Sequence, residues 1–126
     1  MDDEIKILER IYDRFNARDI DAVLTALTDD VAWANGMDGG HVHGREAVRA
    51  YWTRQWSMVS PRVEPVGFHR TADGAIFAEV RQSVRDLAGN PLQGQATHGL
   101  QDKTVGHVFR LREGKVARFD IQDVIR

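Results

Sequence analysis

The chain has 126 residues, of which 42% are apolar and 29% are charged, with no cysteine and a formal net charge of −2. These values are typical of one globular domain over residues 1–126, and they exclude a disordered chain, disulfides and cysteine nucleophiles. The near balance of positive and negative charge argues against nucleic-acid binding. The first residues are acidic and the apolar runs are short, which predicts a cytoplasmic protein without a signal peptide or membrane segment.

The first thirty residues predict two helices. Apolar residues recur at three- and four-residue spacing from Ile5 to Phe15, and we expect this helix to end near residues 16–18. Asp19 is placed as the N-cap of a short second helix that carries the apolar residues from Ile20 to Leu27.

A short strand and a third helix follow. Alternation over Val31–Asn35 predicts a strand, and the glycine-rich residues 36–44 predict a loop. Helical periodicity returns from Arg45 to Val59, and Pro61 is expected to end that helix.

The second half of the chain predicts strands at residues 62–71, 75–87, 104–112 and 115–124, joined by tight turns. The polar residues 93–102 are interpreted as an extended loop or a frayed hairpin arm. Helices followed by an antiparallel meander give an α+β domain, with the helices packed on one face of the sheet.

Four polar residues interrupt the apolar faces of these strands: Asn35, Gln82, His107 and Asp123. Alternate side chains of a strand point to opposite faces, so each of these four shares a face with core residues. A polar group there costs free energy unless it is satisfied. Each is either a hydrogen-bonded core residue or part of a pocket that orients a small ligand.

His107 is the candidate catalytic residue, because an unperturbed imidazole titrates near neutral pH. Asp123 is its candidate partner, either to orient the imidazole or to act as a base of raised pKa. The residues proposed to contact a substrate combine polar interruptions with aromatic walls: Tyr12, Trp33, Asn35, Trp52, Trp56, Gln82 and Phe109. Trp52 and Trp56 are equally typical of an ordinary core.

No metal or cofactor is predicted. His41-Val42-His43 followed by Glu46 superficially resembles a cupin metal motif, but the spacing differs and Glu46 begins a helix. The sequence also contains no phosphate-binding loop and no dinucleotide fingerprint.

Three stretches resemble the nuclear transport factor 2-like superfamily, specifically its bacterial SnoaL-like and ketosteroid-isomerase-related branch: residues 11–31, 44–52 and 106–120. The resemblance implies a cone-shaped α+β domain, in which a curved antiparallel sheet wraps around three N-terminal helices and encloses a pocket. It also implies a small-molecule ligand and a homodimer. Family members include isomerases, cyclases, dehydratases and domains that only bind ligands.

The isomerase residues of the family do not carry over to this chain. The proton-shuttling aspartate falls on Asn35, the tyrosine donor falls on Ile11 beside Tyr12, and the protonated carboxylic acid falls on His107. Steroid isomerase activity is therefore not expected.

Two functions stay open from the sequence. The first is a cofactor-independent isomerase, cyclase or dehydratase that acts on a small apolar or polycyclic molecule through His107 and Asp123. The second is a non-catalytic domain for ligand binding or dimerisation.

Overall fold

Three helices and six strands make up the computed structural model, which describes residues 3–35, 39–90 and 103–123, with the backbone but not the side chain of Asp123. In chain order the elements are α1 (Asp3–Asn16), α2 (Ile20–Leu24), β1 (Leu27–Ala34), β2 (His41–His43), α3 (Arg45–Met58), β3 (Ser60–Arg70), β4 (Ile76–Arg85), β5 (Lys103–Arg112) and β6 (Lys115–Asp123). The predicted segment 93–102 lies outside the described residues.

An apolar stripe on α1 and an N-cap on α2 account for the two N-terminal helices. Leu8, Ile11 and Tyr12 form the buried stripe of α1, and acidic residues occupy its first turn, where the helix dipole favours negative charge. The carboxylate of Asp19 accepts a hydrogen bond from the backbone N–H of Ala22 at 3.2 Å, which confirms the predicted N-cap of α2.

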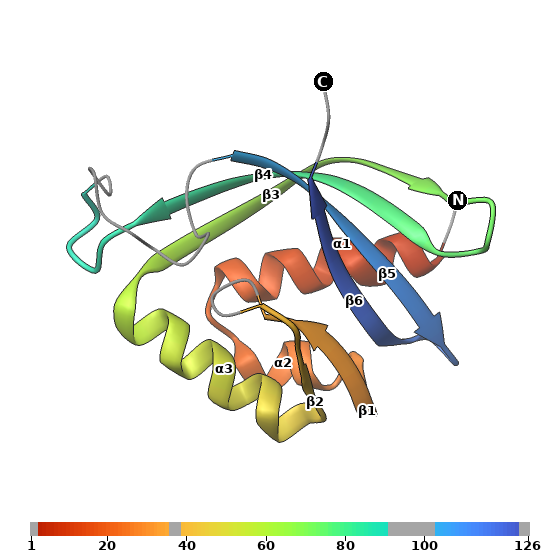
Figure 1. The fold of residues 1–126 in the computed structure, drawn as a ribbon, viewed down its shortest axis with the longest axis horizontal. Coiled ribbons are helices and arrows are strands. Elements are labelled where there is room, and N and C mark those ends of the chain that lie inside the picture. The colour runs from red at the N-terminus through yellow and green to blue at the C-terminus, as the bar shows by residue number, and fades with distance from the viewer. Residues whose placement is uncertain (1–2, 36–38, 91–102, 124–126) are drawn as a thin grey trace.

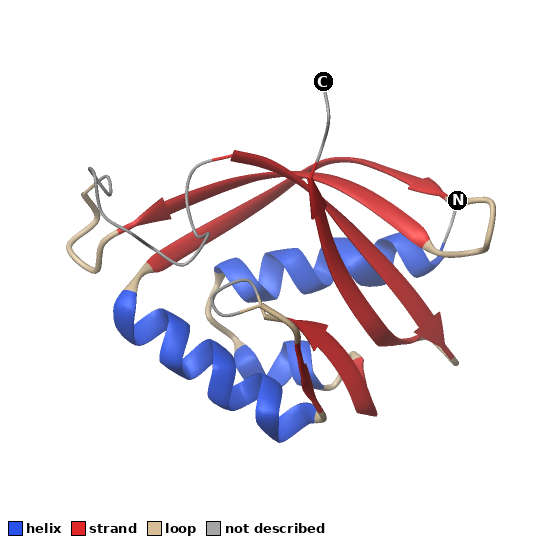
Figure 2. Ribbon diagram, viewed as in Figure 1, coloured by secondary structure: helices blue, strands red, loops and turns tan. Residues whose placement is uncertain are grey.

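The six strands form one bent sheet in the order β2-β1-β6-β5-β4-β3. The three helices gather on one side of it (Figures 1 and 2), where α1 packs against β3 and α3 packs against β1 and β2. The architecture is the predicted α+β cone. The pairing departs from the prediction at one place, because β1 runs parallel to β6 while all the other pairs are antiparallel.

Two local predictions near β1 were wrong. Leu27 was assigned to the second helix, but it begins β1, where it is fully buried and pairs with Val116 of β6. The glycine-rich region was assigned to a loop, but His41–His43 forms β2 and pairs with β1. Leu27 pairs with a strand distant in sequence and β2 pairs with the neighbouring strand β1, and in both cases strand pairing outweighs the local signal.

The edge strand β3 is held to α1 by one side chain. Asn16, the last residue of α1, donates from Nδ2 to the carbonyl oxygen of Val63 at 2.7 Å and accepts from its N–H at 3.0 Å. The amide thus completes the hydrogen bonding of an otherwise unpaired stretch of edge backbone.

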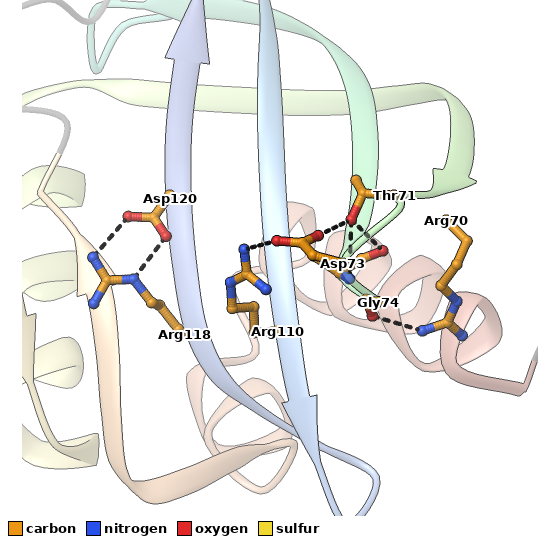
Figure 3. Close-up of polar contacts among 8 residues, drawn as sticks. Arg70, Thr71, Asp73, Gly74, Arg110, Arg118 and Asp120 are labelled. Carbon is orange, nitrogen blue, oxygen red and sulfur yellow. Dashed lines mark hydrogen bonds and ion pairs between the residues drawn. The ribbon is translucent and has the colours of Figure 1, made fainter.

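Figure 3 shows exposed ion pairs that involve the strands of the sheet. Arg110 of β5 pairs with Asp73 in the β3–β4 turn at 2.6 Å, and Arg118 pairs with Asp120 along β6 at 2.8 Å. Hydrogen bonds from Thr71 and Arg110 lower the pKa of Asp73 to about 2. These pairs are exposed, so each contributes little to stability.

Phe77 is partly covered by its own chain. Its ring lies over Gly106 of β5, where a Cβ atom would come within 2.6 Å of the ring, and it stacks on His69 at 5.0 Å. A side chain at residue 106 would therefore displace Phe77.

Within the described ranges, no helix has the length and apolar character needed to cross a membrane.

Replacing Asn16 by Ala should lower the free energy of unfolding by roughly 1–3 kcal/mol, because two hydrogen bonds to partly buried backbone are lost together. Urea denaturation measures this change. Glu9→Ala, at an exposed position of the same helix, is the control and should stay within about 0.5 kcal/mol of the wild type. Equal effects of the two substitutions would contradict the role given to Asn16.

Candidate functional site

A pocket of about 70 Å³ lies between α1, α3 and the inner face of the sheet. No described side chain in its lining carries a formal charge at neutral pH. The lining residues are Ile11, Tyr12, Phe15, Trp33, Ala34, Tyr51, Trp52, Gln55, Pro61, Val63, Gln82, His107, Phe109, Phe119 and Ile121. Apolar and aromatic side chains with a few polar groups are typical of a small-molecule site.

Strand pairing brings His107 to the centre of the inner face. In β5 its Cα lies opposite Ala78 of β4 on one side and Ile121 of β6 on the other. Ala78 is fully buried beneath the helices. Ile121 is 39% exposed, so it lies where the pocket meets the surface.

Tyr12 and His107 form a buried hydrogen bond between α1 and β5. The Tyr12 Oη atom and His107 Nδ1 are 2.7 Å apart, and the two rings are nearly parallel, with an interplanar angle of 7°. Only 5% of Tyr12 and 6% of His107 is exposed. At this depth the hydrogen bond satisfies two polar groups that would otherwise be costly to bury.

Burial keeps both partners neutral. It lowers the pKa of His107 to about 3 and raises the pKa of Tyr12 well above its usual value of 10.0. In both cases the cause is removal of the charged form from water. Over the physiological pH range the pair is therefore an uncharged imidazole and an uncharged phenol.

The second nitrogen of His107, Nε2, has no hydrogen-bond partner among the described residues. Two proton arrangements satisfy the Tyr12 contact. If the phenol donates to Nδ1, Nε2 carries a proton and is a donor. If Nδ1–H donates to the phenol oxygen, Tyr12 Oη–H is free to donate and Nε2 is a base. The second arrangement places a hydrogen-bond donor beside a base.

Aromatic rings form a continuous wall from His107 towards α3. Phe119 meets the imidazole edge-on at 4.8 Å and stacks on Trp33 at 4.2 Å. Trp33 in turn meets Trp52 of α3 edge-on at 5.1 Å. These contacts fix the ring orientations, so the shape of the pocket is set by packing.

A second polar pair lies on α3. Gln55 donates from Nε2 to the Tyr51 hydroxyl oxygen at 3.1 Å, and both residues are buried and line the pocket. Sequence reasoning missed Gln55 as a site residue. The available signal was a polar residue on the same helical face as Trp52, three positions later, where burial predicts an apolar side chain.

Six of the nine residues predicted for the site line this pocket: Tyr12, Trp33, Trp52, Gln82, His107 and Phe109. Two do not line it. Trp56 packs behind the lining against Phe15 and Trp52, and Asn35 follows β1, where its backbone bonds to Gly39 and Gly40.

Asp123 is the ninth predicted residue. Its backbone lies opposite Val105, two positions along from the His107–Ile121 pair. That register puts Asp123 on the same face as His107, and the side chain lies outside the described part of the structure.

His41 of β2 and Glu46 of α3, which belong to the cupin-like pattern, contact different partners. His41 Nε2 contacts Asp120 Oδ1 at 2.7 Å on β6, while Glu46 pairs with Arg49 one turn along α3. Hydrogen bonds from Arg118 and His41 lower the pKa of Asp120 in spite of its partial burial, which acts in the opposite direction.

Comparison with known proteins places this geometry in a family. The family model described as "SnoaL-like domain" matches residues 8–119. No curated relative matches the sequence.

Solved structures share the fold at low sequence identity. A nuclear transport factor 2-like protein of unknown function from Burkholderia pseudomallei is 24% identical, with a TM-score of 0.76 over 98% of this chain and 92% of that one. A candidate polyketide cyclase from Sinorhizobium meliloti is 20% identical, with a TM-score of 0.73 over 97% and 95%. A hypothetical protein from Catenulispora acidiphila with a ketosteroid isomerase-like fold, in complex with trimethylamine, is 16% identical, with a TM-score of 0.70 over 94% and 85%.

The stability of the protein should depend on pH through His107. Its pKa is about 3 in the fold against 6.5 for the free group, so between these values the unfolded state binds a proton that the folded state does not. The free energy of unfolding therefore falls as the pH drops through this window, by up to about 1.4 kcal/mol per pH unit from this group.

Urea denaturation of wild type and His107→Gln at several pH values tests this dependence. The glutamine variant lacks the titrating group, so its stability relative to wild type should increase as the pH falls below 6.5. If the two proteins lose stability in parallel, His107 is not held neutral by the fold.

Proposed function

The chain belongs to the SnoaL-like domain family, and we propose that it binds a small uncharged carbonyl compound and isomerises, cyclises or dehydrates it by cofactor-independent proton transfer. The observation that carries the proposal is the Tyr12–His107 hydrogen bond of 2.7 Å in an apolar pocket, with Nε2 of the imidazole unbonded among the described residues. This pair holds a donor and a base side by side.

The proposed reaction begins with the ligand oxygen bound by the Tyr12 hydroxyl group. The unprotonated Nε2 of His107 takes a proton from the carbon next to the carbonyl. The electron pair of that C–H bond forms a carbon–carbon double bond while the π pair of the carbonyl moves to the oxygen, which gives an enolate. Tyr12 Oη–H stabilises the enolate by hydrogen bonding. The imidazolium then returns its proton to another carbon of the same molecule, so no oxidant, reductant or metal is consumed.

The low pKa of His107 is compatible with this reaction because charge forms on both partners together. In the empty pocket, burial disfavours the imidazolium. Once the enolate forms beside it, the two opposite charges attract each other in a medium that screens them poorly. The site therefore favours an imidazolium–enolate pair over an isolated imidazolium.

Asp123 is proposed as an auxiliary acid–base group. The β5–β6 register supports this role, since it sets Asp123 on the face of His107 and diagonal to it. Asn35 and Trp56 are not assigned ligand contacts, because the pocket lining does not include them.

The free volume favours a small ligand over a polycyclic one. A cavity that encloses benzene has roughly 150 Å³, about twice the 70 Å³ of this pocket, so a ligand of that size would extend through the mouth at Ile121. A polycyclic ligand would have to displace Trp33 or Phe119 from the stacked wall. The uncharged lining also disfavours ionic ligands, because they would lose their hydration without gaining an opposite charge.

A non-catalytic binding domain is the second candidate. The observation that favours it is the same low pKa of His107, since an imidazole of pKa about 3 is a weak base in the unliganded protein. In that case the Tyr12–His107 pair only hydrogen-bonds the ligand. A homodimer and a cytoplasmic location are proposed from the family resemblance and from the composition, respectively.

Isomerisation of 4-penten-2-one to 3-penten-2-one is a direct assay, because this small neutral ketone needs only proton removal and return. The conjugated product is followed by its ultraviolet absorbance. Wild type should exceed the buffer rate, His107→Gln should lower the enzymatic rate by about 10²-fold or more, and Tyr12→Phe by roughly 10- to 100-fold.

His69→Gln is the matched control, because His69 is an exposed histidine stacked on Phe77 outside the pocket. It should leave the rate unchanged. A wild-type rate no faster than buffer, with ketone binding still detected by NMR, would reject the enzyme and support the binding domain.

A further inference from the structure

We propose that Gln55 of α3 is a second ligand-contacting group, and that the pocket selects uncharged molecules with a carbonyl at the His107 end and a hydroxyl group at the Gln55 end. The proposal rests on the proposed function, because it specifies the ligand of the same pocket.

Among the described residues, the buried amide of Gln55 makes one side-chain hydrogen bond. Its side chain is 4% exposed, and Nε2 donates to the Tyr51 hydroxyl oxygen at 3.1 Å. Its Oε1 atom has no hydrogen-bond partner among the described residues. Glutamine is rarely buried this deeply. Among the described residues, Trp56 Nε1 is the fully buried polar side-chain atom without a partner, so Gln55 Oε1 keeps access to the pocket that the residue lines. A ligand hydroxyl group in the pocket would satisfy it.

Either orientation of the Gln55 amide leaves one hydrogen-bonding group for the ligand. With Nε2 towards Tyr51, an acceptor oxygen is left for the ligand; with Oε1 towards the Tyr51 hydroxyl group, the NH₂ group is left. A hydroxyl group on the ligand both donates and accepts, so it pairs with either atom. A carbonyl oxygen would pair only with the second.

The two polar positions are separated by apolar surface. Phe119, Trp33 and Trp52 make successive ring contacts that begin at His107 and end on α3. Trp52 lies three residues before Gln55, which is one turn of the helix. A ligand that reaches both ends therefore needs two oxygens joined by a hydrocarbon segment that lies along these rings.

Two ketones of nearly equal size test the second contact. 4-Hydroxy-2-butanone carries a carbonyl and a terminal hydroxyl group, whereas 2-pentanone has a methyl group in place of that hydroxyl. NMR titration of the wild type gives both dissociation constants. In Gln55→Met, which keeps the length of the side chain without its hydrogen bonds, the affinity for 4-hydroxy-2-butanone should fall roughly fivefold relative to that for 2-pentanone.

Thr53→Ala, at an exposed position of the same helix, is the control and should leave the ratio of the two affinities unchanged. Retained binding of 2-pentanone by Gln55→Met shows that its pocket is intact. Equal loss of both ketones would overturn the proposal, because Gln55 would then support the pocket without selecting a ligand.

The outcome also separates this proposal from the proposed function. If wild type binds both ketones and Gln55→Met leaves their affinity ratio unchanged, only the second contact is wrong. If wild type binds neither ketone, both proposals fail.

Discussion

The hydrogen bond between Tyr12 and His107 is the interaction on which the site depends. It joins α1 to the centre of the sheet, and it allows two polar side chains to be buried at 5% and 6% exposure without charge. The same burial that requires the hydrogen bond also sets the chemistry, since it holds the pKa of His107 near 3 and that of Tyr12 above its ordinary value. The structural role and the proposed catalytic role of the pair therefore have one physical origin, the removal of both groups from water.

The pocket on the inner face of the sheet is lined by uncharged groups, whereas charged groups of the strands are exposed. The described pocket lining offers neutral hydrogen-bonding groups in an aromatic frame, while ion pairs such as Arg110–Asp73 and Arg118–Asp120 lie among exposed side chains. Exposed ion pairs add little stability, so the packing of the inner face is the main stabilising contribution. The free energy of binding then has to come from apolar contact and a few hydrogen bonds, which is the recognition expected for a small uncharged ligand.

The sequence predicted the fold class, the helices and the inner position of His107, because strand parity sets His107 on the same face as Val105 and Phe109, which are both buried. The sequence-based prediction failed where strands that are distant in sequence pair with each other. The parallel contact of β1 with β6 draws Leu27 out of the predicted helix, because Leu27 pairs there with Val116. Strand parity could not exclude Asn35, because β1 ends one residue before it. Gln55 was missed because a single polar residue is common on a helix that is only partly buried.

The neutral state of His107 underlies both the burial of the pair and its proposed chemistry, and ¹⁵N chemical shifts of the imidazole ring measure that state directly. A series of spectra between pH 4 and pH 8 should show a neutral ring with no titration, in keeping with a pKa of about 3. The chemical shift of Nδ1 should also report its hydrogen bond to Tyr12, and this contribution should disappear in Tyr12→Phe. An inflection near pH 6.5, with both nitrogens protonated below it, would contradict the account.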